Sequence, residues 1–157
     1  MPIDLSPMLE PARCAVLVFE CQEHTIGSGS AIPGLVASVE QGGVLEHIAL
    51  LLANARRVGA PVFYCNAVGR PTGLGAARTP LTARVKRSGP PPDTSVVKAL
   101  APEPGDAVIE RPHGMSGFYD SGLDPCLRDL GITTVIPTGV SLNIGVLGTT
   151  IEAVNRG

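Results

Sequence analysis

A carboxylate and an amide that could take part in catalysis follow the first apolar run of the chain. Glu20 and Gln22 come directly after residues 15–19, all of which are apolar. A carboxylate in this place can act as a general acid or base when its pKa lies near the working pH. A solvated glutamate at the end of a strand is the alternative, and the neighbouring Gln22 favours the catalytic interpretation.

A cation and a titratable ring occur together after a later apolar segment. Arg111 and His113 follow residues 107–110. A guanidinium can hold a carboxylate in a bidentate fork but does not give up its proton, so Arg111 would either anchor a substrate or polarise Glu20. His113 can titrate near neutral pH, and a histidine of an exposed loop is equally compatible with the sequence.

A third group of candidate residues surrounds a glycine near the carboxyl end of the chain. Ser141, Asn143 and Gly145 follow the apolar segment 133–138. Serine and asparagine can hydrogen-bond a ligand, but they also cap helices, and capping is the favoured interpretation for Asn143. The backbone N–H of Gly145 can bind an anion if a helix begins there.

The spacing of apolar residues indicates the elements that would position these groups. Residues 44–58 have helical spacing and are followed by Gly59 and Pro61, which end helices. Short apolar runs indicate strands, and two further helices follow the last loops. The expected strands are 15–19, 61–67, 107–110 and 133–138, and the further helices cover 123–130 and the residues from 143 to a C-cap at Gly157.

This alternation predicts an α/β fold, a doubly wound (Rossmann-like) parallel sheet flanked by helices on both faces. Ligands of such sheets bind at the carboxyl ends of the strands, where the candidate residues lie. The length of 157 residues fits a single domain, 1–157. A domain of this type normally continues into another strand, so we expect that its C-terminal strand or strands are missing from this sequence.

The composition limits the classes of molecule that the protein is expected to bind. The net charge of -2 and the 44% hydrophobic content exclude a strongly basic nucleic-acid-binding protein. The apolar stretches are shorter than the roughly 20 residues of a membrane span, so we expect a soluble, cytoplasmic protein. The four cysteines contain no C-x-x-C pair and are expected to be small buried residues.

The segment 69–104 is rich in glycine, proline and arginine and has two interpretations. Basic residues occur at positions 70, 78, 84, 86 and 87, with no acid between Ala67 and Pro92. Such a segment can be a lid that attracts an anionic substrate. An exposed surface loop is the favoured interpretation, because long irregular loops are more often solvated than functional.

Several motifs, taken in order and spacing, resemble the isochorismatase-like superfamily of isochorismatases, nicotinamidases, carbamoyl-amide hydrolases and cysteine hydrolases. They are AVLVFECQ (15–22), ARRVGAPVFY (55–64), PGDAVIER (104–111), SGF (116–118), LDPCLR (123–128), GI (131–132), GV (139–140) and TTIEAVNRG (149–157). The resemblance spans nearly the whole chain and implies the doubly wound fold expected above.

In the amide-cleaving branch, this resemblance implies a triad of aspartate, lysine and a nucleophilic cysteine. Glu20 stands at the aspartate position, and Gly145 replaces the cysteine. Arg111 is the cation nearest to the lysine position, although counting back from Ser116 places Pro112 there. A residue without a side chain cannot form a thioester, so covalent amidase chemistry through position 145 is excluded.

Some true isochorismatases resemble this chain in carrying glycine at that position. Cleavage of their vinyl ether can proceed by protonation of the enol ether and attack of water, with Glu20 as the acid. We therefore expect a hydrolase of a small, anionic metabolite that needs no covalent cysteine intermediate. The alternative is a catalytically silent member that binds a metabolite or serves as a subunit of an assembly.

The remaining expectations concern ligands and assembly. The metal-binding amidases of the superfamily carry Asp and His after the second strand, whereas residues 65–72 (CNAVGRPT) contain neither, so no metal and no cofactor are expected. The partners are expected to be a small-molecule substrate and further copies of the chain in a homo-oligomer, with no nucleic acid and no membrane. The residues expected to contact the substrate are Gln22, His113, Phe118, Ser141 and Asn143.

Overall fold

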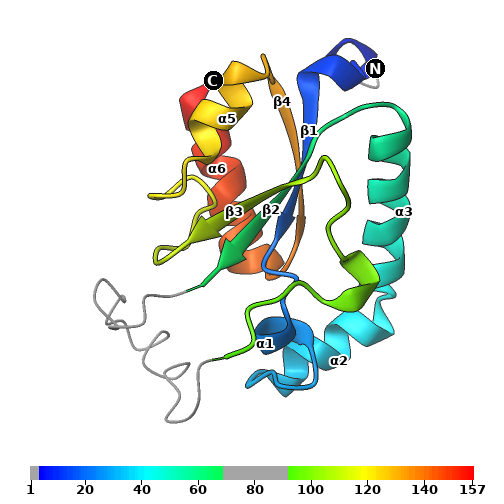
Figure 1. Ribbon diagram of the computed structural model, residues 1–157, viewed down its shortest axis with the longest axis vertical. Coiled ribbons are helices and arrows are strands. Elements are labelled where there is room, and N and C mark those ends of the chain that lie inside the picture. Colours follow the sequence, from blue (N-terminus) through cyan, green and yellow to red (C-terminus); the bar gives the residue numbers. More distant parts are fainter. Residues whose placement is uncertain (1–3, 69–91) are drawn as a thin grey trace.

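Four parallel strands form the centre of the computed structural model, which describes residues 4–68 and 92–157 (Figure 1). The strands are β1 (Cys14–Phe19), β2 (Val62–Ala67), β3 (Ala107–Arg111) and β4 (Thr134–Gly139). Their order in the sheet is β3-β2-β1-β4, and β1 pairs with both β2 and β4. The predicted parallel α/β sheet is confirmed, with each strand within two residues of its expected bounds.

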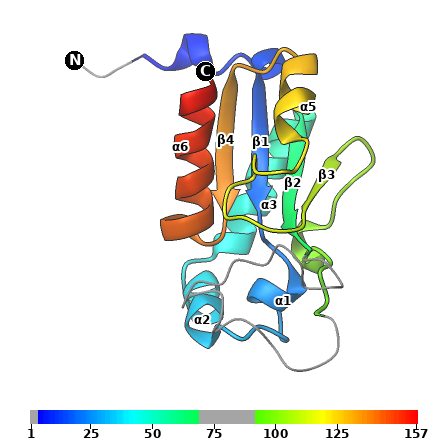
Figure 2. The ribbon, with the colours of Figure 1, turned by 90° about the vertical axis from the view of Figure 1, so that its left-hand side faces the viewer.

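Helices cover both faces of the sheet (Figures 1 and 2). On one face lies α3 (Val44–Arg57), and on the other lie α5 (Leu123–Asp129) and α6 (Leu147–Arg156). The helix α2 (Pro33–Gln41) lies beyond the carboxyl ends of the strands, against α3. A short helix, α1 (Glu23–Ile26), follows β1 at the carboxyl ends of the strands. The sequence did not predict α1 and α2, although Pro33 at the first turn of α2 is a common helix start.

Short helical turns complete the described structure. They are η1 (Ser6–Met8), η2 (Pro11–Arg13), η3 (Lys98–Leu100) and the π-helical turn η4 (Leu142–Val146), which leads directly into α6.

The central strand β1 is buried on both faces because all six of its residues are apolar. Alternate residues of β1 join two separate cores. Val16 and Val18 pack with α3, through Ile48 and Leu52 among others. Residues on the opposite face pack beneath α5 and α6; this second core includes Ala15, Leu17, Phe19, Phe63, Cys65, Phe118, Leu123, Leu127 and Val146. Each large apolar side chain buried in this way stabilises the fold by about 1.5–3 kcal/mol.

Part of the segment expected to be an exposed loop is instead buried. Val97 and Leu100 are 6% and 2% exposed. The N–H of Val97 donates to the carbonyl of Cys21 at 3.0 Å. The hydroxyl of Tyr64 donates to the carbonyl of Leu100 at 2.8 Å. The expectation of a surface loop is therefore wrong for this part. Residues 69–91, which carry the basic cluster, lie outside the described residues.

Among the described helices, no single one is long and apolar enough to cross a membrane. The helices α2 and α3 reach the required length and composition only as a pair, and they are bent by 62° where they meet.

Candidate active site

Glu20 projects from a sharp turn at the carboxyl end of β1. Its φ of 48° lies in the left-handed region, which is uncommon for a residue other than glycine. The N–H of Glu20 donates to the carbonyl of Cys65 at 3.2 Å, and the N–H of Gln22 donates to the carbonyl of Glu20 at 2.8 Å. The side chain of Glu20 remains 25% exposed.

The guanidinium of Arg111, the last residue of β3, forms an ion pair with the carboxylate of Glu20. Its other terminal nitrogen, Nη1, donates to the carbonyl of Gly114. The side chain of Arg111 is 3% exposed, and its Nε has no hydrogen-bond partner among residues 4–68 and 92–157. Because both ends of the fork already contact protein acceptors, this geometry favours polarisation of Glu20 over direct anchoring of a substrate.

Burial raises the pKa of Glu20 above its ordinary value, and the charge of Arg111 opposes that rise. A carboxyl with a raised pKa retains its proton at a higher pH than a carboxyl in water does. Glu20 is therefore better suited to donate a proton than a solvated glutamate would be.

Gly145 is buried within η4, immediately beyond β4. A Cβ atom built on Gly145 would lie 2.1 Å from Cε1 and 2.7 Å from Cδ1 of Phe19. Both distances are far shorter than a van der Waals contact. The ring of Phe19 therefore occupies the space that any side chain at position 145 would enter.

Thr149 connects Gly145 to the loop after β3, and sequence analysis missed it. Its hydroxyl donates to the carbonyl of Gly145 at 2.7 Å and accepts from the N–H of Gly117 at 3.0 Å. Thr149 is fully buried. The available signal was its place four residues after Gly145, since a threonine in a helix often bonds the carbonyl at i−4.

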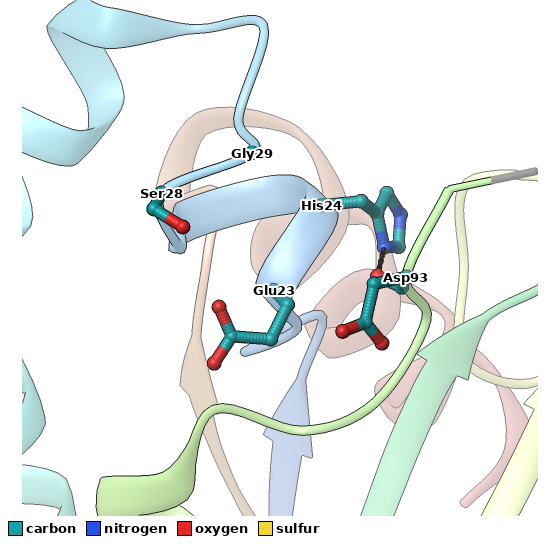
Figure 3. Close-up of a pocket in the computed structure, with 5 residues that line it drawn as sticks. All are labelled: Glu23, His24, Ser28, Gly29 and Asp93. Atoms are coloured by element: carbon teal, nitrogen blue, oxygen red, sulfur yellow. Dashed lines mark hydrogen bonds between the residues drawn. The ribbon is translucent and has the colours of Figure 1, made fainter. Parts of the chain in front are cut away.

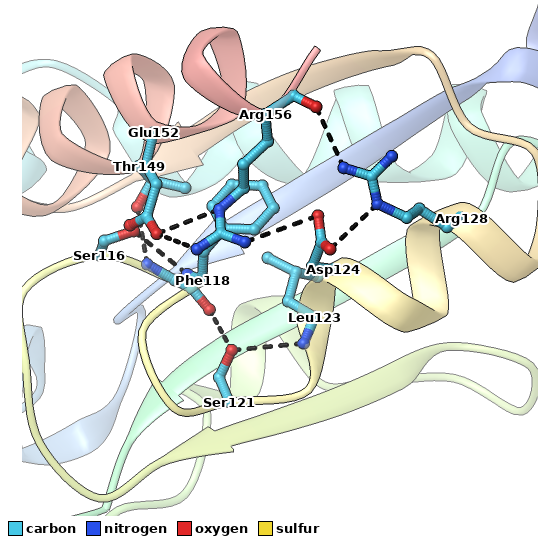
Figure 4. A network of polar contacts seen from close by, with 10 residues as sticks. Ser116, Phe118, Ser121, Leu123, Asp124, Arg128, Thr149, Glu152 and Arg156 are labelled. Atoms are coloured by element: carbon cyan, nitrogen blue, oxygen red, sulfur yellow. Dashed lines mark hydrogen bonds and ion pairs between the residues drawn. The ribbon is translucent and has the colours of Figure 1, made fainter.

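The loop after β3 is also connected to α5 and α6 by polar contacts (Figure 4). Arg156 forms ion pairs with Glu152 and Asp124, and its guanidinium lies 5.1 Å from the ring centroid of Phe118. The Phe118 ring is 7% exposed and belongs to the core. The expected contact of Phe118 with substrate is not supported, because helix and loop residues surround the ring.

The structure gives Gln22 a structural role in place of the expected contact with substrate. Its amide nitrogen donates to the carbonyls of Ala67 and Thr94, at 3.1 and 2.7 Å. Its amide oxygen accepts from the N–H of Ala67 at 2.8 Å. Gln22 is fully buried, so its side chain ties the end of β1 to the end of β2 and is closed to solvent.

The expected capping role of Asn143 is wrong. Asn143 lies inside η4, whereas Ser141 is the N-cap residue, and the described structure shows no capping hydrogen bond from the Ser141 side chain. The carbonyl of Ser141 accepts from the N–H groups of Ile144 and Val146. Asn143 is exposed, and its contact with substrate stays a prediction, as does that of Ser141.

His113 lies beside two residues of its own loop. Its Nε2 is 3.4 Å from a carboxylate oxygen of Asp120, and its ring meets that of Tyr119 edge to face, with the centroids 5.1 Å apart. No contact joins His113 to Glu20 or Arg111 in the described part of the chain. Its role in substrate binding stays a prediction.

Two of the four cysteine thiols are poorly suited to act as nucleophiles. Burial raises the pKa of Cys21 and that of Cys65 to about 12, so both remain protonated thiols at neutral pH. Cys14 is also buried, whereas Cys126 is only partly buried. The expectation of buried cysteines is thus confirmed for three of the four.

The described surface is hollowed at α1 and along the start of α6. The first pocket, about 170 Å³, lies at α1 and is lined by Glu23, His24, Ser28, Gly29 and Asp93 (Figure 3). The second, about 470 Å³, is open and lies along the start of α6; its lining residues are Leu142, Asn143, Val146, Leu147 and Thr150. Glu20, Arg111 and Gly145 line neither pocket. Within residues 4–68 and 92–157, no three His, Cys, Asp or Glu side chains gather as metal ligands.

The profile of the isochorismatase domain matches residues 14–157. The chain is 31% identical over 166 aligned residues to the ureidoacrylate amidohydrolase RutB of Methylobacterium radiotolerans. That alignment covers 94% of this chain but 64% of the relative, so the chain spans less than two thirds of the relative's length.

Solved structures of similar proteins share the fold. The N-carbamoylsarcosine amidase of Thermoplasma acidophilum superposes with a TM-score of 0.73 at 28% identity, covering 92% of this chain and 77% of that one. A cysteine hydrolase of Pseudomonas syringae pv. phaseolicola gives a TM-score of 0.75 at 26% identity, covering 99% of this chain and 70% of that one. Since the domain profile matches nearly the whole chain, the protein belongs to the isochorismatase family.

Proposed function

We propose that this chain forms the acid–base site of a hydrolase that acts on a small metabolite without a covalent enzyme intermediate. Relatives named as an amidohydrolase, an amidase and a cysteine hydrolase support the reaction class. The observation that carries the proposal is the pairing of Glu20, which is partly exposed, with the buried guanidinium of Arg111. Glu20 is the acid or base, and Arg111 controls its ionisation.

Gly145 takes the place of the nucleophile in this proposal. It lies where a helical segment begins beyond β4, on the same side of the sheet as Phe19. Position 145 has no side chain, and Cys21 and Cys65 are protonated thiols, so we take water as the nucleophile. The backbone at the start of η4 would bind negative charge that develops on the substrate.

The chemistry of a vinyl ether needs only these groups. The carboxyl proton of Glu20 passes to the terminal carbon of the enol ether, which becomes an oxocarbenium ion. Water adds to that ion and returns a proton to the carboxylate, and the resulting hemiketal breaks into an alcohol and a ketone. For an amide, the ionised Glu20 would instead remove a proton from the attacking water.

Assays of the full chain test the proposal. Isochorismate, ureidoacrylate and N-carbamoylsarcosine are the first substrates to compare, with wild type and Glu20→Gln measured in parallel. We expect Glu20→Gln to lower kcat by about 10²-fold or more on the substrate that is turned over, because general acid–base catalysis contributes that much. Glu110→Gln, at an exposed residue of β3, is the matched control. Equal rates for Glu20→Gln and wild type would exclude Glu20 as the catalytic group.

A silent binding protein is the second candidate, and the enclosure of Arg111 favours it. Both terminal nitrogens of Arg111 contact acceptors of the protein, an arrangement that stabilises a fold as well as a reaction. A silent protein would turn over no substrate of the panel, yet one of these compounds would raise its melting temperature. Glu20→Gln would then retain that shift, whereas loss of turnover in this variant supports the hydrolase.

The expectations of an anionic substrate, a cytoplasmic location, a homo-oligomer and no metal or cofactor stay predictions. Exposed apolar side chains of α6 support an oligomer, since Leu147, Ile151 and Val154 are 50%, 54% and 76% exposed on one side of the helix. Light scattering after size-exclusion chromatography would give the mass of the particle, and a monomer would contradict the expectation.

A further inference from the structure

The ring of Phe19 lies in a narrow space between two glycines. On one side, a Cβ atom on Gly145 would come within 2.1 Å of the ring. On the other side, a Cβ atom on Gly117 would lie 3.4 Å from Cε2. Phe19 is 1% exposed. The ring therefore has little room to turn away from a new side chain at position 145.

A single side chain fixes the two glycines relative to each other. The hydroxyl of Thr149 bonds the carbonyl of Gly145 and the N–H of Gly117. Because Thr149 is fully buried, breaking either bond would leave a polar backbone group without a partner. The backbone around the ring cannot easily widen to relieve a clash.

The ring also supports the ion pair. The guanidinium of Arg111 lies 5.1 Å from the centroid of the Phe19 ring, a distance at which a cation and an aromatic face attract each other. Glu20, the next residue along the chain, contacts the same guanidinium. Phe19 thus contacts both the glycine position and the cation that faces Glu20.

We propose that Phe19 and Gly145 form a coupled pair, in which the ring fills the volume of a side chain at position 145 and holds Arg111 against Glu20. Phe19 is then a positioning residue for the carboxyl group. Its effect on catalysis rests on the proposed function, whereas the exclusion of a side chain at position 145 rests on packing alone.

The exclusion of a side chain at position 145 is tested by substituting two glycines of the continuous helical segment formed by η4 and α6. Gly145→Ala is expected to lower the melting temperature, because its Cβ meets the ring. Gly148→Ala is the matched control, because a Cβ there would have no neighbour within 4 Å, and we expect its melting temperature to be equal or higher. Equal melting temperatures for Gly145→Ala and Gly148→Ala would overturn the coupling.

A double variant separates the clash from a general loss of stability. Phe19→Val alone leaves a cavity and lowers the melting temperature, but it also makes room at position 145. We therefore expect Phe19→Val/Gly145→Ala to melt at a higher temperature than the sum of the two single shifts predicts. Additive shifts would overturn the coupling even if each single variant is unstable.

The positioning role of Phe19 is tested through the pKa of Glu20, which a change in packing alone would not alter. Phe19→Leu keeps an apolar side chain but removes the aromatic face from Arg111. We expect the pKa of Glu20, followed by carboxyl ¹³C NMR with Glu20→Gln to assign the signal, to rise further in this variant, because Arg111 opposes the rise less well. Gly148→Ala should match wild type. An unchanged pKa in Phe19→Leu would overturn the positioning role, and neither result depends on turnover.

Discussion

Glu20 and Arg111 are 91 positions apart in the sequence, yet their side chains form an ion pair at the carboxyl edge of the sheet. Glu20 follows β1 and Arg111 ends β3, and β2 lies between these two strands. The arginine must therefore reach across the end of β2, and its long side chain does so over the ring of Phe19. The contact depends on the strand order as much as on the two residues.

Replacement of the Arg111 guanidinium by a lysine ammonium should destabilise the fold more than the same replacement at an exposed arginine. A lysine ammonium cannot reproduce two divergent contacts, one to Glu20 and one to the carbonyl of Gly114. We expect Arg111→Lys to lower the free energy of unfolding by about 1–3 kcal/mol, because a buried acceptor loses its donor. Urea denaturation would measure the change.

Arg128 is the matched control for that substitution. It also contacts one carboxylate, of Asp124, and one carbonyl, of Arg156, both at 3.0 Å, but its side chain is 59% exposed. Water can replace these contacts, so we expect Arg128→Lys to change the free energy of unfolding by less than about 0.5 kcal/mol. Equal losses in the two variants would mean that the enclosure of Arg111 has no energetic consequence.

The hydroxyl of Thr149 should matter more than that of its neighbour Thr150. Both donate to the carbonyl four residues earlier, but Thr149 is fully buried and also accepts from Gly117, whereas Thr150 is exposed. We expect Thr149→Val to cost about 2 kcal/mol of stability and Thr150→Val less than about 0.5 kcal/mol. Thermal unfolding of the two variants would test this. Equal stabilities would mean that the hydrogen bonds of Thr149 to Gly145 and Gly117 do not stabilise the fold.

Thiol reactivity should separate the cysteines. Cys21 and Cys65, with pKa values raised to about 12 by burial, should resist alkylation by iodoacetamide at pH 8 in the folded protein. Cys126 is only partly buried and should react first. Peptide mapping by mass spectrometry before and after addition of urea would show the order. Rapid modification of Cys65 in the folded protein would reopen the possibility of a thiol nucleophile.

The sequence predicted the strands because their apolar runs are short, continuous and bounded by charged or turn-forming residues. It also placed Glu20 and Arg111 at one edge, since carboxyl ends of parallel strands share an edge. The helix α2 was missed because its residues have a weak apolar pattern between two glycine-rich turns. Burial of Leu100 was missed because η3 is too short to show a period.

The details of the site could not be read from the sequence, because they depend on contacts between distant segments. Gln22 was expected to contact a substrate, but its amide bonds residues that lie 45 and 72 positions away. The enclosure of Arg111 and the place of the Phe19 ring beside Gly145 likewise follow from packing across strands. Residue types indicated which chemistry was available, and tertiary contacts determined which groups remained free to perform it.

The raised pKa of Glu20 predicts the direction in which stability changes with pH. Burial raises this pKa above the value of 4.5 that the group would have in the unfolded chain, and Arg111 only partly opposes it. Between these two values the folded protein binds more protons than the unfolded chain. The free energy of unfolding therefore falls as the pH rises through this window, and the fall is complete above the folded pKa.

The Glu20→Gln variant should not show this fall in the free energy of unfolding, because the amide of glutamine stays neutral between pH 4 and pH 8. We expect the stability of wild type relative to Glu20→Gln to decrease from pH 4 to pH 8, as measured by urea denaturation at a series of pH values. If the proton of Glu20 is used in catalysis, kcat should fall over the same window, because the acid form disappears. A relative stability that rises with pH would mean that Arg111 outweighs burial and holds Glu20 ionised, which would remove the acid from the proposed enol-ether cleavage.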